Sequence, residues 1–498
     1  MMQGKVAIIG SGFSGLSAAC YLAAAGYDVD VYEKNETIGG RARQFETKEG
    51  FRFDMGPSWY WMPDVIGDFF RDFDHEVSDF YELTSLNPQF EMVFDKESVC
   101  VPAGMQELRQ LFEDIEESAG SRFDKFMEAA RYKYEVGMKD FVNKPCHSWW
   151  EFVSPKIAKS ALRLNLLTDF RKYVRQYFTD PKLVALMEFP VIFLGAAPKD
   201  IPAMYSLMNY GGYGLGTWYP AGGFVQVVEA MAKVAASMGV RFHVGQAVRR
   251  VLLEGSHAIG IQLDEETITC DVVVGSADYQ HVESLLPADA RNYSMDYWER
   301  KTFAPSCLIF YLGFKRKIDG LKHHTLFFEN ELDGHVHAIY TDKKWPESPL
   351  FYACCPSKTD KDVAPEGCEN VFLLMPIATG LDDNDEIREQ YFNEMIERLE
   401  RHTGQTGLRD DIIYKKSYCV RDFMQDYNAY QGNAYGLANT LRQTAVWKPA
   451  VRNKKVDNLF YTGQLTVPGP GVPPAIISGK IIAQEIIKNK DLRYEKIV

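Results

Sequence analysis

The feature that most constrains the fold is a glycine-rich turn between two short apolar runs near the start of the chain. Residues 5–34 read KVAIIGSGFSGLSAACYLAAAGYDVDVYEK, and residues 6–9 and 29–32 have the apolar character of buried strands. Between them, small and apolar residues recur at helical spacing. The order of strand, glycine turn, helix and strand predicts a parallel βαβ unit.

Each glycine of the turn has a predicted role in binding a dinucleotide. Gly10 permits the tight turn, Gly12 lets the backbone approach a pyrophosphate, and Gly15 lets the helix pack closely on the strand. The phosphates would lie at the helix N-terminus beside Phe13 and Ser14, where free N–H groups and the helix dipole favour anions. The pattern therefore predicts a Rossmann-type nucleotide site.

An acidic residue follows the second predicted strand. Glu33 lies 18 residues after Gly15, where it can accept hydrogen bonds from a ribose diol. A glycine-rich turn without a ligand would leave this acid unexplained. A secretory signal peptide would also account for the uncharged run of residues 6–26. A signal peptide is removed from the mature protein, however, and the βαβ unit needs this run for its first strand.

The composition narrows the class of function. The chain has 498 residues, which is too long for one hydrophobic core, so we expect two or three domains. Its net charge of −13 argues against nucleic acid as a partner. The nine cysteines are scattered without a CxxC pair, as expected for reduced thiols in a cytoplasmic protein, and Cys354 and Cys355 are predicted to be small buried side chains.

One long uncharged stretch could be mistaken for a membrane span. Residues 201–228 carry no charged side chain and are long enough to cross a bilayer. They also contain six glycines and two prolines, many of them clustered as NYGGYGLGTWYPAGG. Such clusters are typical of loops, so we predict that no segment of the chain spans a membrane.

The residues after Glu33 indicate which dinucleotide is bound. Gly39, Gly40 and Arg41 are not part of an ordinary NAD fingerprint. With the glycine turn, they resemble the flavoprotein group of amine oxidases, protoporphyrinogen oxidases and carotenoid desaturases. The resemblance implies that Gly40 and Arg41 continue an FAD pyrophosphate site. The alternative is that Arg41 and Arg43 are solvated surface charges.

Five further blocks resemble the bacterial-type phytoene desaturase family, in family order across essentially the whole chain. They imply an α/β, amine-oxidase-like fold with FAD as the cofactor. The blocks are residues 51–63 (FRFDMGPSWYWMP), 180–198 (DPKLVALMEFPVIFLGAAP), 217–231 (TWYPAGGFVQVVEAM), 427–437 (YNAYQGNAYGL) and 468–480 (PGPGVPPAIISGK).

The end of the chain is predicted to complete the flavin pocket. Residues 459–462 read as a last strand, and Pro473 and Pro474 begin a helix that continues to residue 488. By resemblance, the positive end of this helix points at the flavin ring, where reduction builds negative charge. Many relatives carry an acid at the position of Gln464, although glutamine can still bond a hydroxyl. The other implied cofactor contacts are Gly56, Val248, Gly463 and Val472.

The resemblance implies a Rossmann-type FAD-binding domain built from discontinuous segments, a substrate domain with a mixed or antiparallel sheet, and a helical membrane-facing insert. Residues 306–314 and 370–377 read as strands of the second sheet, and residues 105–198 read as mainly helical. The expected boundaries are 1–70, 217–282 and 450–498 for the FAD domain, 71–104 and 283–449 for the substrate domain, and 105–216 for the insert.

Aromatic and basic side chains gather within residues 148–182, opposed there only by Glu151, Asp169 and Asp180. This composition suits an interfacial helix on anionic lipid, and it also suits a solvated helix face. Because the implied substrate is a hydrocarbon found in membranes, we expect the protein to bind peripherally to the inner face of the cell membrane. The side chains are Trp149, Trp150, Phe152, Lys156, Lys159, Arg163, Arg171, Lys172, Arg175 and Lys182.

The implied activity is FAD-dependent desaturation of a carotene, most simply phytoene to lycopene. Hydride would pass to flavin N5 and a proton would leave the neighbouring carbon, with quinone or oxygen as the final electron acceptor. A hydrocarbon offers no polar handle, so we assign no catalytic side chain and expect an apolar tunnel that aligns the substrate. Candidate walls are Trp59, Tyr60, Trp61 and Tyr435.

Three other functions remain open. A related enzyme could act at the 3,4 bond of γ-carotene or a hydroxylated carotene. A flavin amine oxidase and a non-catalytic isoprenoid carrier of the same fold are more distant alternatives. No metal is expected, because no cysteine or carboxylate stands at ligand spacing from the chain's clustered histidines, which we predict to lie on strand surfaces. These are His323, His324, His335 and His337.

Overall fold

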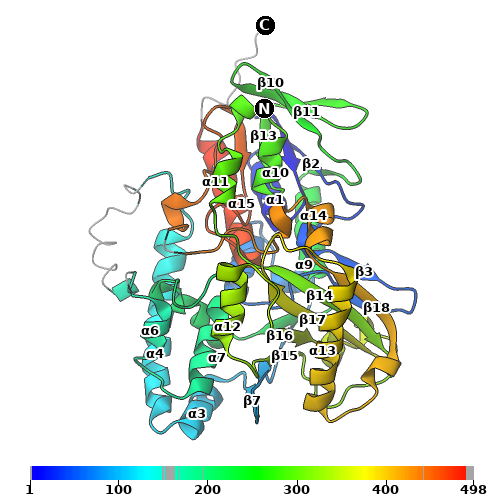
Figure 1. The fold of residues 1–498 in the computed structure, drawn as a ribbon. Helices are drawn as coiled ribbons and strands as arrows, with labels where there is room; N and C mark the ends of the chain where they lie inside the picture. Colours follow the sequence, from blue (N-terminus) through cyan, green and yellow to red (C-terminus); the bar gives the residue numbers. More distant parts are fainter. Residues whose placement is uncertain are drawn as a thin grey trace.

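Two large β-sheets and a group of helices organise the chain (Figure 1). The parallel sheet lies in the upper half of the view, the mixed sheet lies in the lower half, and helices α3, α4, α6 and α7 stand to one side. The computed structural model describes residues 3–148, 151, 163–166, 168–192, 194–440 and 442–489.

The first sheet has five parallel strands in the order β19-β13-β1-β2-β9. Its strands come from three distant parts of the chain, so this layer forms only when the two ends meet. The predictions of strands at 6–9, 29–32 and 459–462 are confirmed within one residue. The strands are β1 (Lys5–Ile9), β2 (Asp28–Tyr32), β9 (Arg241–His243), β13 (Val272–Gly275) and β19 (Leu459–Tyr461).

Three helices flank this sheet: α1 (Phe13–Ala24), α9 (Val225–Ser237) and α15 (Val472–Lys488). The predicted C-terminal helix is thereby confirmed. The first and last helices touch closely, because a Cβ at Gly479 would lie 2.4 Å from the carbonyl oxygen of Ser14. The hydroxyl of Ser17 also donates to the Ile476 carbonyl at 2.7 Å.

The second sheet has seven strands in the order β18-β14-β17-β16-β15-β6-β7. All neighbours are antiparallel except β15 and β6. Helix α13 (Asp385–Thr403) covers one face of the sheet and shares an apolar core with it. The strands are β6 (Phe90–Val93), β7 (Ser98–Val101), β14 (Ser306–Phe314), β15 (His324–Phe327), β16 (Phe351–Cys354), β17 (Glu369–Ile377) and β18 (Ile412–Tyr418).

The two strands predicted for this sheet, at 306–314 and 370–377, are confirmed as β14 and β17. The domain boundaries themselves stay predictions. Smaller strands complete the described chain: β10 (Arg250–Glu254), β11 (His257–Gln262) and β12 (Thr267–Thr269) form one antiparallel sheet, while β3 (Gln44–Glu46) pairs with β4 (Arg52–Asp54) and β5 (Leu83–Ser85) pairs with β8 (Trp218–Pro220).

The described residues between 105 and 198 are mainly helical, as predicted. They form α3 (Met105–Ile115), α4 (Ala119–Val136), α6 (Phe170–Val174) and α7 (Pro181–Ile192). In the part of the chain that the structure describes, no helix has both the length and the apolarity needed to cross a membrane. The remaining α-helices among the described residues are α2 (Pro63–Arg71), α8 (Leu207–Asn209), α10 (Tyr279–Ser284), α11 (Met295–Glu299), α12 (Leu332–His337) and α14 (Val420–Tyr427).

The glycine-rich stretch after residue 201 differs from the prediction of loops. Residues 203–214 form consecutive short helical segments. Cβ atoms at Gly211 and Gly212 would lie 3.0 Å from Met62 and 2.9 Å from Trp61. These glycines therefore allow a helix to approach neighbouring side chains, which is a packing role that composition cannot distinguish from a turn.

The basic cluster of the insert is only partly described, since Trp149, Trp150, Phe152, Lys156 and Lys159 lie outside the described residues. Arg171 binds Glu188 at 3.1 Å and Asp333 at 2.7 Å, and Lys182 binds Glu97 at 2.9 Å. Counting only the nearby acids therefore overestimated the free positive charge, because acids from distant segments neutralise part of it.

The contact between α1 and α15 leads to a stability prediction. Gly479→Ala should lower the stability of the fold by about 1–3 kcal/mol, because the added methyl group meets backbone atoms of α1. The measurement is the midpoint of thermal unfolding. Gly334→Ala in α12 is the matched control, because nothing lies within 4 Å of the added Cβ. Equal midpoints for both variants would contradict the close packing.

Candidate functional site

One cavity of about 480 Å³ lies at the carboxyl ends of the parallel strands. Ile9 of β1, Tyr32 of β2 and Gly463 after β19 all line it. This edge is where open α/β sheets bind ligands. The cavity is polar beside the parallel sheet and apolar where it extends towards the mixed sheet and α12.

The cavity brings together the predicted cofactor residues from both ends of the chain. Gly15 is the exception, because it does not line the cavity. A Cβ at Gly15 would lie 2.3 Å from the Gly10 carbonyl oxygen, so this glycine allows the predicted close packing of helix on strand. The residues that line the cavity are Gly10, Gly12, Phe13, Ser14, Glu33, Gly40, Arg41, Gly56, Val248, Gly463, Gln464 and Val472.

The N-terminus of α1 faces this cavity at Gly12, and no described side chain caps it. Its first N–H groups therefore remain available to a ligand, and the helix dipole favours an anion there. A Cβ at Gly40 would approach the Gly12 Cα to 3.3 Å, so a larger residue would crowd this turn. The turn thus presents bare backbone where a pyrophosphate would bind.

Glu33 is buried at the end of β2 and ties two loops together. Its carboxylate accepts hydrogen bonds from the Ser11 backbone N–H at 3.1 Å and the Ser11 hydroxyl at 2.7 Å. It also accepts from the Asn35 backbone and side-chain amides, at 3.0 and 2.8 Å. The acid therefore holds the glycine turn in place as well as lining the cavity, while the ribose contact stays a prediction.

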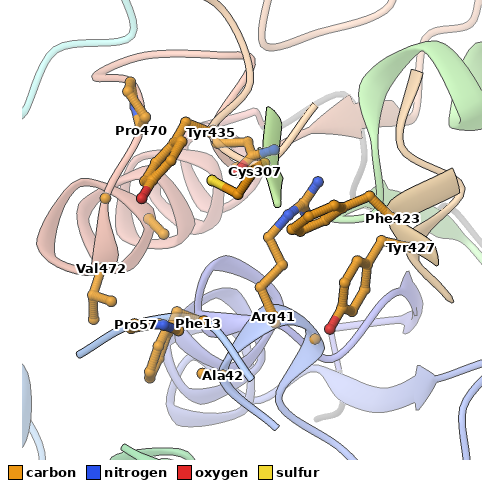
Figure 2. A pocket seen from close by; sticks show the side chains of 18 of the residues that line it. Phe13, Arg41, Ala42, Pro57, Cys307, Phe423, Tyr427, Tyr435, Pro470 and Val472 are labelled. Carbon is orange, nitrogen blue, oxygen red and sulfur yellow. The ribbon is translucent and has the colours of Figure 1, made fainter. Parts of the chain in front are cut away.

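Arg41 enters the same wall from the segment after β2 (Figure 2). Its guanidinium donates through Nη2 to the Asn433 carbonyl at 3.0 Å and lies over the Tyr427 ring, 5.1 Å from the centroid. The buried Nε has no hydrogen-bond partner among the described residues. Burial lowers the Arg41 pKa, and Asp278 nearby opposes that effect. A phosphate oxygen would satisfy the remaining donor.

The alternative that Arg41 and Arg43 are merely solvated charges is not supported. Arg41 lines the cavity as described, and the Arg43 side chain is only 12% exposed. Arg43 forms an ion pair with Asp426 at 3.0 Å, which anchors the segment after β2 to α14.

Asp278 is a site residue that the sequence analysis missed. It caps α10 by accepting from the Gln280 N–H at 3.1 Å, and it accepts from the Asn433 amide at 3.0 Å. Burial raises its pKa although Asn433 and Arg41 favour the charged form. The apolar run that precedes it and forms β13 was the available signal, because the carboxyl ends of parallel strands meet at one edge of a sheet.

Gln464 lines the cavity, and its side-chain amide bonds neighbouring protein groups. Hydrogen bonding favours the amide orientation in which its oxygen accepts from Arg41 Nη2 at 3.1 Å and from the Gly436 N–H at 3.2 Å. An acid at this position would add a charge beside Arg41, and the neutral amide does not. The substitution therefore leaves more of the guanidinium charge to a bound phosphate.

These observations fit a flavin dinucleotide. The uncapped helix terminus and the unpartnered Arg41 Nε supply donors for a pyrophosphate, and the glycines leave room for it. The start of α15 forms another part of the wall, since Val472, Pro473 and Pro474 line the cavity.

The apolar half of the cavity contains three of the four predicted wall residues. Trp59, Trp61 and Tyr435 line it, and Figure 2 shows Tyr435 close to Cys307. Tyr60 does not line the cavity: it is 1% exposed, and its hydroxyl bonds the Tyr81 hydroxyl at 2.8 Å. In an extended segment successive side chains point to opposite sides, so Tyr60 turns away from its tryptophan neighbours.

The four histidines do not lie on strand surfaces, so that prediction is wrong. His323 and His324 are buried at the start of β15, whereas His335 and His337 belong to α12. Both ring nitrogens of His335 are used, one near the Pro376 carbonyl at 2.7 Å and one accepting from the Leu350 N–H at 2.8 Å.

Comparison with known proteins finds a flavoprotein family and carotenoid desaturases. Residues 13–487 match the family of flavin-containing amine oxidoreductases. The chain is 41% identical to a carotenoid 3,4-desaturase of Haloarcula japonica, covering 97% of this chain and 98% of the relative. It is 29% identical to a zeta-carotene-forming phytoene desaturase of Myxococcus xanthus, covering 97% and 94%.

Solved structures share the fold at low identity. An oxidoreductase from Methanosarcina mazei matches with a TM-score of 0.62 and 17% identity, covering 96% of this chain and 100% of that chain. Cyclohexylamine oxidase from Brevibacterium oxydans matches with a TM-score of 0.59 and 15% identity, covering 98% and 100%. The predicted amine-oxidase-like α/β fold is confirmed. The family match confirms a flavin, and the dinucleotide turn identifies it as FAD. The chain therefore belongs to the flavin-containing amine oxidoreductase family.

Proposed function

We propose that this protein is an FAD-dependent carotenoid desaturase. The observation that carries the proposal is a single cavity whose dinucleotide-binding half opens directly into an apolar half. An elongated hydrocarbon could thus reach the cofactor without crossing a polar surface. The similarity to carotenoid desaturases over nearly the whole chain supports the same substrate class.

Two bonds are candidates for the reaction. The higher identity to the 3,4-desaturase, 41% against 29%, favours the 3,4 bond of an acyclic or hydroxylated carotene. The blocks that resemble phytoene desaturases keep conversion of phytoene to lycopene as the second candidate. Both reactions remove a hydride and a proton from adjacent carbons, so the same site serves either.

FAD, when bound, supplies the hydride acceptor for this chemistry. The chain's own residues would hold it: α1 would present its N-terminus and Arg41 its buried guanidinium to the pyrophosphate. The N-terminus of α15 lines the cavity, and its partial positive charge would stabilise negative charge on a bound flavin.

Aromatic walls align the substrate and exclude water. Trp59 packs against Trp61 and Phe189, with ring centroids 5.3 Å apart in both pairs. Rings packed in this way can move little, so the cavity wall would hold an extended hydrocarbon in one orientation. Further apolar lining comes from Ile192, Leu326, Phe328, Val336 and Ile339.

The amine oxidase alternative is disfavoured by the charges of the cavity. The acidic residues among its described lining, Glu33, Asp278 and Asp426, all belong to the dinucleotide-binding half. A protonated amine in the apolar half would therefore be buried without a counter-charge, which is costly. A carrier without flavin would have no use for the donors around Arg41.

Peripheral contact with the inner face of the cell membrane is part of the proposal. Carotenes partition into bilayers, so the enzyme must take its substrate from lipid. Exposed Arg163, Lys172 and Arg175 on the insert support contact with anionic headgroups. Quinone or oxygen would reoxidise the cofactor.

The cofactor site leads to a prediction on FAD retention. Arg41→Ala should weaken FAD binding by roughly 10–100-fold, because a buried charged donor to the pyrophosphate is lost. Glu33→Ala should also lower FAD content by loosening the glycine turn. Flavin absorbance per chain at about 450 nm measures both. Arg52→Ala, which removes an exposed partner of Glu46, is the control. Normal flavin content in both site variants would contradict the placement of the cofactor.

The substrate prediction is tested with purified, FAD-supplemented protein and carotenes in liposomes. Phytoene, γ-carotene and a hydroxylated carotene are offered separately, and products are identified by chromatography and absorption spectra. We expect a new double bond in at least one of these carotenes, and the 3,4 position is the favoured site. Lycopene or its precursors from phytoene would support the second candidate. Flavin-loaded protein that leaves every carotene unchanged would exclude the desaturase.

A further inference from the structure

A cluster of potential metal ligands lies outside the cavity lining. His323 and His324 stand at the start of β15, and Cys354 ends the neighbouring strand β16, where it is paired with His324. One ring nitrogen of each histidine and the Cys354 sulfur all lie within 4.8 Å of one another. The three residues are 6%, 0% and 2% exposed, so solvent does not stabilise their polar atoms.

The hydrogen bonds around the two histidines leave ring nitrogens unused. His323 Nδ1 is 2.7 Å from the Thr359 hydroxyl, and His324 Nδ1 is 2.6 Å from the Tyr352 hydroxyl. Both Nε2 atoms are buried without a hydrogen-bond partner among the described residues. An unpaired buried polar atom is costly, so two of them on rings whose centroids lie 4.5 Å apart require an explanation. Metal-binding histidines show this arrangement, with one nitrogen held by an outer partner.

We propose that His323, His324 and Cys354 bind one Zn²⁺ ion. Two imidazoles and a thiolate form a ligand set that zinc accepts, with a fourth position left for water. A small cavity of about 20 Å³ borders His323 and Cys354, and a water needs only about 10–15 Å³. Small shifts of the side chains would bring the three ligand atoms from their present separations to zinc-bonding distances.

The charges near the cluster suit a divalent cation. The Cys354 thiol would give up its proton and bind the ion as a thiolate. Asp54 borders the same small cavity. Zn²⁺ bound to one thiolate keeps one positive charge, which the Asp54 carboxylate would balance.

The position of the ion indicates that it acts on the cavity wall and not on the substrate. None of its three ligands lines the large cavity, so the ion would not touch the substrate. The Trp59 ring, which does line the cavity, stacks on His324 with centroids 4.1 Å apart and an angle of 13°. An ion on His324 would therefore fix the aromatic wall from behind. The site does not depend on which substrate the cavity takes.

Zinc binding by the FAD-loaded protein tests the proposal. The protein is freed of metal with a chelator, mixed with Zn²⁺, desalted and analysed for zinc per chain by mass spectrometry. We expect one zinc per chain in the unaltered protein and loss of that zinc in Cys354→Ser and His324→Asn. Cys355→Ser is the matched control, since this neighbouring buried thiol bonds Glu369 instead and its variant should keep the zinc. Thr359→Val should weaken zinc binding by roughly 10–100-fold, because it removes the outer partner of His323.

Cobalt provides a second readout that does not depend on activity. Co²⁺ bound to a cysteine thiolate gives a near-ultraviolet charge-transfer band, seen as a difference spectrum against the same flavoprotein before cobalt. The band should appear in the unaltered protein and in Cys355→Ser, and be absent from Cys354→Ser. Flavin content reports whether each variant is folded. Unaltered, FAD-loaded protein that retains no zinc, or zinc that survives both Cys354→Ser and His324→Asn, would overturn the proposal.

Discussion

The close contact between α1 and α15 is the interaction on which the rest of the site depends. Gly479 lets the last helix meet the backbone of the first, and the hydroxyl of Ser17 bonds across the contact. This contact places the N-termini of both helices on one cavity. Two helix dipoles therefore converge where a dinucleotide would bind, although more than 400 residues separate the helices in sequence.

The cavity joins two environments with opposite physical demands. Its polar half buries the Arg41 guanidinium beside Asp278, where a hydrogen bond to the Asn433 carbonyl satisfies part of the charge and a bound phosphate would satisfy more of it. Its apolar half is lined by packed aromatic and aliphatic side chains. A flavin is suited to this junction, because its dinucleotide tail is charged and its ring reacts with an apolar substrate.

Much of the nucleotide half could be predicted from the sequence, because the glycine turn, its flanking strands and Glu33 are contiguous and follow fixed spacings. The strands β14 and β17 were also predictable from their continuous apolar runs. Predictions failed where the same residue types serve two purposes. Gly211 and Gly212 were read as loop residues but allow close packing, and Tyr60 points away from the cavity that its neighbours line.

The sequence by itself determined the dinucleotide turn, the strands around it and the flavoprotein family, since local spacing sets backbone conformation and exposes the N–H groups that bind phosphate. Only the tertiary structure decided that Asp278 lies near Arg41, that Gln464 bonds Arg41, and that Cys354 joins His323 and His324. These pairings depend on strand register and helix packing between distant segments. A one-residue change of strand register would turn each strand side chain to the opposite face of the sheet. The local sequence pattern does not show which register distant segments adopt.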